Sequence, residues 1–126
     1  MTQADAPHLP NPAPIDAYGN GGFRFAGMSH RGSLLCLPNG IWAWPVSDVR
    51  DITTASLEVV FAGAADIHVF LIGAGRDPWR IPDRLRQRFR NAGISVDAMT
   101  TGAAAQTYNI LLEEGRRVGA ALIAVE

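Results

Sequence analysis

Residues 67–72, Ile-His-Val-Phe-Leu-Ile, form a nearly continuous apolar run that ends in Gly73-Ala74-Gly75. A short apolar run bounded by glycine suits a strand that is buried on both faces, and such strands are typical of parallel sheets. Parallel strands must be joined by long crossover connections, usually helices. This run therefore constrains the fold of the whole chain, and we expect it to lie inside a covered sheet.

The residues after this run alternate between helix and strand patterns. Pro82 opens a helix whose apolar face carries Leu85 and Phe89, and Gly93 ends it. After it come a short strand at 94–99, a helix capped by Thr100 or Thr101, and a last strand at 118–125. The C-terminal half therefore predicts a β-α-β-α-β unit, the pattern of a parallel sheet with right-handed crossovers.

The N-terminal half is predicted to be a β meander that joins this sheet or packs beside it. Residues 18–44 show strand patterns punctuated by glycine, with Pro38-Asn39-Gly40 as a turn. A short helix is expected around 55–61. Residues 1–17 contain four prolines and little apolar surface, so we expect a disordered tail there and a single domain over 18–126. The predicted fold is α/β, with three layers and a central, mostly parallel mixed sheet.

Composition narrows the class of protein. The chain has 126 residues, a net charge of −1, one cysteine and no lysine among its eleven basic residues. One cysteine excludes an intrachain disulfide, and the near-neutral charge argues against a nucleic-acid partner. No apolar run approaches the ~18 residues of a membrane span. Residues 1–17 lack the pattern of a signal peptide, so we expect a cytoplasmic protein.

Catalytic and metal-binding patterns are not recognisable in the sequence. The three histidines are His8 in the tail, His30, and His68 inside the apolar run, where it predicts a core histidine. They and Cys36, which lies in a strand and reads as a buried structural thiol, have no metal-ligand spacing. Glu113 and Glu114 would face different directions on a helix. We therefore expect no catalytic residues, no metal and no cofactor.

Two loops at the carboxyl ends of predicted strands are the candidate binding site. In open α/β sheets, ligands bind beyond these ends. Gly73-Ala74-Gly75-Arg76 follows the buried run, and Arg76 offers a cation for an anionic group. Met99-Thr100-Thr101-Gly102 opens a helix, whose free N–H groups favour an anion. The alternatives are a tight turn that needs small residues and ordinary helix capping.

The helix that follows adds three candidates one to two turns further on. Thr107, Tyr108 and Asn109 are polar or aromatic. Asn109 in mid-helix has a propensity cost, which suggests a specific polar contact. Tyr108 lies on the apolar stripe and is also explained as a core residue. The full set of expected ligand- or partner-binding residues is Gly73, Ala74, Gly75, Arg76, Met99, Thr100, Thr101, Thr107, Tyr108 and Asn109.

Arginines recur between residues 76 and 90. Arg76, Arg80, Arg84 and Arg88 are spaced four apart, and like charges at this spacing slightly destabilise a helix. An acidic partner would explain them, and so would a solvated surface. RNA is a weaker alternative, because no stacking aromatics are interleaved apart from Phe89 on the apolar face.

Several short motifs together resemble a known family. They are Tyr18-Gly19-Asn20-Gly21-Gly22-Phe23-Arg24, Gly32-Ser33, Ile72-Gly73-Ala74-Gly75, Val96-Asp97-Ala98-Met99-Thr100-Thr101, Thr107-Tyr108-Asn109 and Glu114-Gly115-Arg116. The chain resembles, from about Tyr18 to Val125, the small α/β domains of bacteria and archaea that include the mitochondrial assembly factor 3 of respiratory complex I. Relatives usually have Gly-Thr-Gly where Ala74 stands here, so a contact through that hydroxyl is lost.

The resemblance implies a three-layered fold without established enzymatic activity. It implies a role in assembling or chaperoning a respiratory membrane complex, with complex I subunits or another assembly factor as partners. The resemblance, with no presequence, implies a bacterial member that is cytoplasmic or held at the inner membrane through its partners. The alternative is a small-anion-binding protein or enzyme that uses a cleft between Gly73–Arg76 and Met99–Gly102. Trp42 and Trp44 fit either a self-association edge or the core, so the oligomeric state stays open.

Overall fold

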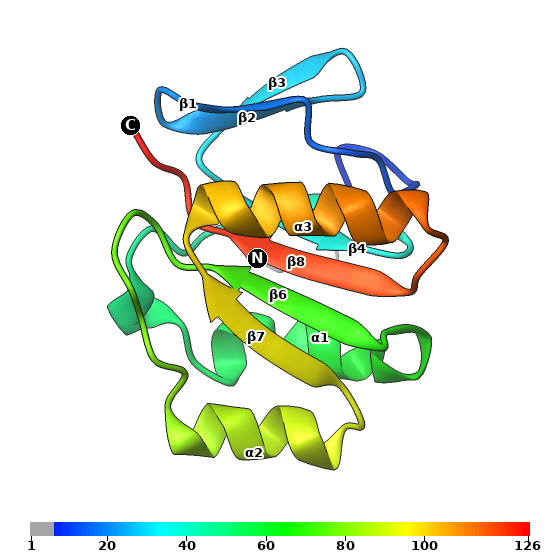
Figure 1. Cartoon of the computed structure of the whole chain (residues 1–126), viewed down its shortest axis with the longest axis vertical. Helices are drawn as coiled ribbons and strands as arrows, with labels where there is room; N and C mark the ends of the chain where they lie inside the picture. The colour runs from blue at the N-terminus through cyan, green and yellow to red at the C-terminus, as the bar shows by residue number, and fades with distance from the viewer. Residues whose placement is uncertain (1–6) are drawn as a thin grey trace.

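The computed structural model describes residues 7–126 and arranges them in three layers (Figure 1). The strands are β1 Ala17–Gly19, β2 Gly22–Phe25, β3 Met28–Arg31, β4 Ser33–Leu37, β5 Gly40–Trp44, β6 Val69–Gly73, β7 Ser95–Met99 and β8 Val118–Leu122. The helices are α1 Glu58–Ala62, α2 Asp83–Asn91 and α3 Thr101–Glu113, with 3₁₀ turns at Val49–Asp51, Ala55–Leu57 and Ala64–Asp66.

The central sheet has the order β5-β4-β8-β6-β7. Strand β6 runs parallel to both β8 and β7, whereas β4 is antiparallel to β5 and β8. The predicted β-α-β-α-β unit and the mixed sheet are therefore confirmed. The apolar run supplies β6, which lies between two other strands, and Phe70, Leu71 and Ile72 are all buried.

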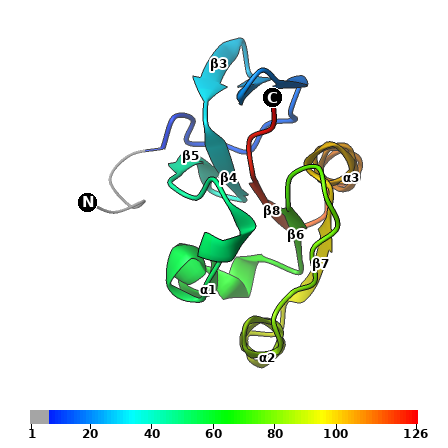
Figure 2. The ribbon, with the colours of Figure 1, turned by 90° about the vertical axis from the view of Figure 1, so that its left-hand side faces the viewer.

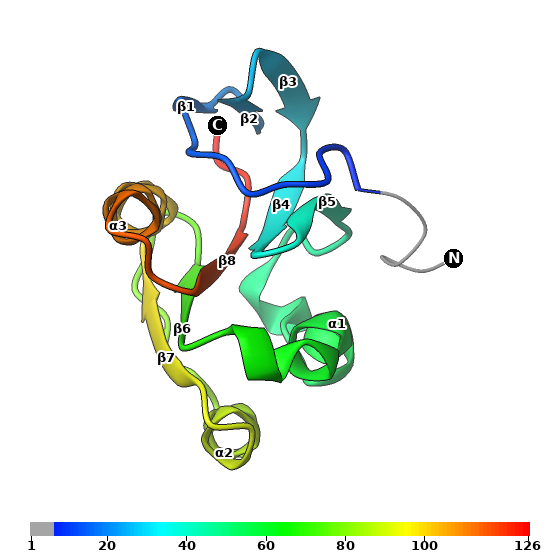
Figure 3. The same cartoon turned by 90° about the vertical axis from the view of Figure 1, so that its right-hand side faces the viewer.

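Helices cover the central sheet on opposite faces (Figures 2 and 3). Helix α2 connects β6 to β7, which is the neighbour of β6 on one side. Helix α3 connects β7 to β8, which is the neighbour of β6 on the other side, so the two crossovers run in opposite directions along the sheet. Crossovers of one hand that progress in opposite directions place their helices on opposite faces. Accordingly Phe70 and Ile72 pack with α2 in one core, and Leu71 packs with α3 in a second core.

The N-terminal meander divides between two sheets. Strands β1, β2 and β3 form a separate antiparallel sheet, and the hairpin β4–β5 extends the central one. The small sheet packs over the α3 side of the domain, since Phe23 and Phe25 belong to the same core as residues of α3. The sequence left two arrangements open for the meander, and each applies to one part of it: β4 and β5 join the main sheet, and β1–β3 pack beside it.

The segment that precedes β1 makes specific contacts from residue 8 onward. Leu9 forms an isolated antiparallel bridge with Ile41, and the N–H of His8 donates to the carbonyl of Ile41 at 2.8 Å. Ile15 is 5% exposed and belongs to the α3-side core. Residues 1–6 of the expected tail lie outside the described residues, and the domain boundary at residue 18 stays a prediction.

Two residues differ from or refine the sequence interpretation. The prediction of a core histidine at His68 is wrong: its side chain is exposed beside that of Arg117, because β6 begins one residue later, at Val69. Trp42 and Trp44 are buried at 8% and 3% exposure, and the Trp44 indole donates to the Ser56 carbonyl at 2.9 Å. The core alternative for these tryptophans is therefore the observed one.

Candidate functional site

The two predicted site loops meet at one edge of the central sheet. Gly73 and Met99 are register partners at the ends of the parallel strands β6 and β7, so the segments that follow them leave the sheet side by side. Thr100 caps α3 at its first turn through a 3.4 Å contact with the Ala103 N–H. The expected strand-end arrangement of Gly73–Arg76 beside Met99–Gly102 is present.

A buried hydroxyl ties these loops together. The Thr101 Oγ1 donates to the carbonyl of Ile123 at 2.7 Å and accepts from the N–H of Gly75 at 3.0 Å. The N–H of Thr101 donates to the Gly75 carbonyl at 2.9 Å, and that of Ala74 donates to the Met99 carbonyl at 2.8 Å. The backbone N–H groups of Ala74, Gly75 and Thr101 are thus already hydrogen-bonded within the chain.

Positions 73 and 75 of the first loop need glycine for different physical reasons. At Gly73 a Cβ would lie 3.0 Å from the Thr101 Cα and 3.2 Å from the Ala104 Cβ, so glycine lets α3 pack directly against β6. Gly75 has a φ of +92° with open space around it, so it supplies the left-handed backbone of the turn. The alternative of a turn that needs small residues accounts for both positions.

A groove of about 760 Å³ lies between this loop, β1 and the first half of α3. It is lined by Gly75, Arg76, Thr100 and Asn109 from the predicted set, and also by Asp16, Tyr18, Gly102 and Gln106. The ring of Tyr18 is 52% exposed and covers Gly102 so closely that a side chain there would displace it. Arg76 and Asp16 are the charged side chains among the described lining residues.

A second hollow of about 330 Å³ lies on the other side of Arg76. It is lined by Ala74, Gly75, Arg76 and Trp79, together with Asp48 and residues of the C-terminal segment. The Arg76 guanidinium donates to the backbone carbonyl of Glu126 between the two hollows. Arg76 is therefore the cation that both hollows share.

Asn109 makes the specific polar contact that its mid-helix position suggested. Its Oδ1 accepts from the N–H of Ile15 and its Nδ2 donates to the carbonyl of Ile15, both at 2.8 Å. The side-chain amide thereby acts as a strand partner for the backbone of residue 15 and anchors the segment before β1 on α3. Both residues line the groove, and the contact occupies both polar atoms of the Asn109 side chain.

The other predicted site residues lie away from the groove. Gly73, Thr101 and Tyr108 are buried, whereas Met99 and Thr107 are half-buried and line neither hollow. Burial raises the pKa of the Tyr108 phenol. Tyr18 and Asp16 were not predicted as site residues, because their approach to α3 depends on how the small sheet packs and has no local sequence signal.

Cys36 and His30, two titratable groups with shifted pKa values, lie outside both hollows. Burial raises the pKa of the Cys36 thiol to about 12, which confirms a structural cysteine. Burial and the neighbouring ring of His8, whose centroid is 4.7 Å away, lower the pKa of His30. Across residues 7–126, no three His, Cys, Asp or Glu side chains gather as a metal site would require.

Several arginines of the series between residues 76 and 90 make contacts within the protein. Arg88 lies over the Phe61 ring at 4.2 Å, and Arg90 donates to Gln87 at 3.1 Å. Arg80 lies 3.5 Å from Asp83 in an exposed ion pair. These contacts account for several members of the series without an external partner.

Comparison with known proteins identifies the family. The model of a family described as a protein of unknown function (DUF498/DUF598) matches residues 15–123. The chain belongs to this family. This confirms the resemblance inferred from the sequence motifs, because the family includes the complex I assembly factors as well as bacterial and archaeal relatives.

Three relatives show the range of the family. The chain is 40% identical over 110 residues, 87% of its own length and 83% of the relative's, to an uncharacterized protein of Rhodobacter capsulatus. It is 33% identical to NADH dehydrogenase [ubiquinone] 1 alpha subcomplex assembly factor 3 of Mus musculus, over 91% of this chain but only 62% of that protein. A crystal structure described as an outer membrane protein from Bartonella henselae superposes with a TM-score of 0.91 at 49% identity, and covers 94% of this chain and 100% of that one.

The description as an outer membrane protein applies to the Bartonella henselae protein. In the present chain, no helix within residues 7–126 combines the length and hydrophobicity that crossing a membrane requires.

Proposed function

We propose that this protein is a non-catalytic binding protein that assists the assembly of a respiratory membrane complex of the complex I type. The observation that carries the proposal is the 33% identity to the mouse assembly factor over 91% of this chain. The match takes in 115 residues of this chain and 62% of that factor's length, so most of this chain has a counterpart in part of that factor.

The chemistry of the site supports binding rather than catalysis. The polar groups with the best-defined geometry, the Thr101 hydroxyl and the Asn109 amide, are used to hold the chain's own backbone. The described groove residues offer one cation and one carboxylate, Arg76 and Asp16, on a largely exposed surface. Covalent catalysis needs a nucleophile and a base within hydrogen-bond distance of each other. A groove with one cation and one carboxylate is better suited to recognising a partner.

The partners in this proposal are complex I subunits or another assembly factor. The protein acts in the bacterial cytoplasm, or at the inner membrane where its partners hold it, and it needs no cofactor for this role.

The proposal is tested by affinity isolation of the tagged chain from its native cells, followed by mass spectrometry, with a tag-only strain as the control. We expect respiratory-complex subunits or assembly proteins to be enriched, and a deletion strain to lose part of its NADH:quinone oxidoreductase activity. A deletion strain with normal activity, together with no enrichment of such proteins, would refute the assembly role.

A small-anion-binding protein, or an enzyme that acts on an anionic substrate, is the second candidate. The observation that favours it is the position of Arg76 between two hollows, next to the start of α3. A thermal-shift screen against anionic metabolites tests it, since a ligand at a hundred times its Kd stabilises the folded state by about 2.7 kcal/mol. The shift should disappear in Arg76→Ala and persist in Arg86→Ala, an exposed arginine on α2. A screen without any shift contradicts this candidate.

A further inference from the structure

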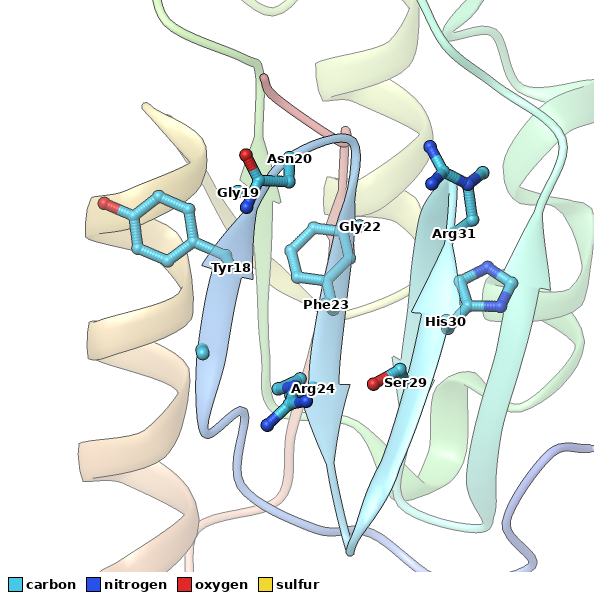
Figure 4. A pocket seen from close by; sticks show the side chains of 10 residues that line it. Tyr18, Gly19, Asn20, Gly22, Phe23, Arg24, Ser29, His30 and Arg31 are labelled. Carbon is cyan, nitrogen blue, oxygen red and sulfur yellow. The ribbon is translucent and has the colours of Figure 1, made fainter.

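The small sheet presents one apolar face and one basic face. Phe23 and Phe25 point into the α3-side core, whereas Arg24 between them is exposed. On the neighbouring strand β3, Ser29 and Arg31 are exposed in the same alternation. Arg24 is the register partner of Ser29, so Arg24, Ser29 and Arg31 stand on the face turned away from the domain (Figure 4).

This outer face is hollowed at its centre. A depression of about 410 Å³ covers it, and the outer-face positions next to the arginines are small: Ala17 beside Arg24 and Gly19 beside Gly22 on β1, and Gly22 itself on β2. Gly22 is the register partner of Arg31, so Arg24 and Arg31 occupy diagonal positions across β2 and β3. Diagonal residues of an antiparallel pair have Cα atoms about 7–8 Å apart. Figure 4 shows Arg24 beside Ser29 at one end and Arg31 level with Gly22 at the other.

Neither arginine is neutralised by a close contact. The ion pairs found among residues 7–126 involve Arg50 and Arg80, and the side chains of Arg24 and Arg31 make no hydrogen bond to another described residue. The carboxylate of Glu126 approaches the same side of Gly21 as the Arg31 guanidinium, without forming an ion pair with it. Two guanidinium groups on one small face favour an anionic partner, which they bind through bidentate hydrogen bonds.

We propose that the outer face of β1–β3 binds an acidic segment of a partner protein in an extended conformation, with carboxylates at positions i and i+2. In an extended chain these side chains point to the same side and lie about 6.6 Å apart, close to the diagonal spacing of Arg24 and Arg31. The small residues next to the arginines, Ala17, Gly19 and Gly22, let the segment's backbone approach the sheet, and Ser29 adds a hydroxyl. This inference rests on the proposed role in protein binding and assigns its surface and partner chemistry.

Other anions fit this surface less well. Small-molecule sites are concave and enclose most of their ligand, whereas Arg24, Ser29 and Arg31 are all exposed. A nucleic acid would gain from a wider positive field, but the chain carries a net charge of −1. An acidic peptide needs only the local pair of cations.

The test is an NMR titration of the ¹⁵N-labelled full chain with a capped peptide of alternating glutamate and threonine. We expect shift changes centred on the amides of Gly22 and Ser29, and weaker binding at higher salt. The variant R24Q/R31Q should bind the peptide about tenfold more weakly. The control variant R84Q/R86Q removes the same charge from exposed positions of α2 and should bind like the original chain.

Three results would overturn the assignment: equal binding of a peptide in which glutamine replaces glutamate, unchanged affinity in R24Q/R31Q, or shift changes centred outside β2 and β3. Saturation of the same amides by inorganic phosphate at lower concentration than the peptide would show a small-anion site instead. The assembly role can fail separately, since peptide binding at this face would survive an affinity isolation that recovers no respiratory-complex protein.

Discussion

Replacing Thr101 by valine removes the hydroxyl that joins three segments while it keeps the shape of the side chain. Thr101 is 0% exposed, and its Oγ1 bonds the Ile123 carbonyl at 2.7 Å and the Gly75 N–H at 3.0 Å. Valine fills the same space but leaves both backbone groups without this partner. An unsatisfied buried polar group costs about 1–3 kcal/mol. Because the Gly75 position is only partly buried, we expect a total loss of about 2–4 kcal/mol.

The loss is measured by urea unfolding of the original chain and the variant. A change of about 2–4 kcal/mol is a large part of the 5–15 kcal/mol that usually stabilises a domain, and it should lower the Tm by on the order of 10 °C. Thr101→Ser keeps the hydroxyl and loses one methyl group, so it should cost only about 1 kcal/mol. Thr107→Val is the matched control. It makes the same chemical change at a half-buried position of α3 whose side chain has no hydrogen bond in the described structure.

The order of the variants in free energy of unfolding tests whether the Thr101 hydroxyl holds the loops together. If Thr101→Val unfolds within about 0.5 kcal/mol of the original chain, or if Thr101→Ser is the less stable of the two, the hydroxyl does not hold the loops together. Hydrogen exchange gives a second readout, since the Gly75 amide should lose protection in Thr101→Val and keep it in Thr107→Val.

Three further predictions use other contacts. Gly73→Ala places a methyl group 3.0 Å from the Thr101 Cα and should cost about 1–3 kcal/mol in a chemical unfolding experiment, whereas an unchanged midpoint would show that α3 can move away. Asn109→Ala removes both 2.8 Å hydrogen bonds to Ile15, so the stability should fall by about 1–3 kcal/mol and the amide of Ile15 should exchange faster; Asn109→Asp should keep only the bond that its oxygen accepts. The lowered pKa of His30 means that the unfolded chain binds more protons just below pH 6.5, so stability should fall as the pH drops through that value, and His30→Gln should flatten this part of the profile.

The local sequence pattern was sufficient to predict an element where the spacing of apolar residues in that segment alone indicates which faces are buried. The apolar run around Phe70 became the parallel strand β6, and the threonine signal at Thr100 became the N-cap of α3. The start of β6 does not follow from the same pattern: the apolar run includes His68, but the strand begins after it and the His68 side chain is exposed. Hydrophobicity along the chain does not show where a strand starts to pair, because pairing depends on the neighbouring strand.

The candidate site followed from the sequence only in outline. Strand-end topology predicted that the loops after Gly73 and Met99 would be neighbours, and they are register partners. The sequence left open whether their polar groups face a ligand or the chain itself. The structure shows that Thr101 and Asn109 serve the chain's own backbone, through partners 22 and 94 residues away in sequence.

The sequence by itself determined the class of the fold, the alternation of strands and helices after residue 67, and the family, because these depend on local periodicity, capping residues and short motifs. Tertiary structure decided the position of the small sheet and the placement of Tyr18 over α3, and it turned the face that carries Arg24 and Arg31 away from the domain. The physical reason is that such contacts join segments whose separation along the chain carries no periodic signal. They are set when the small sheet packs over the α3 face of the central sheet, opposite the face that α2 covers.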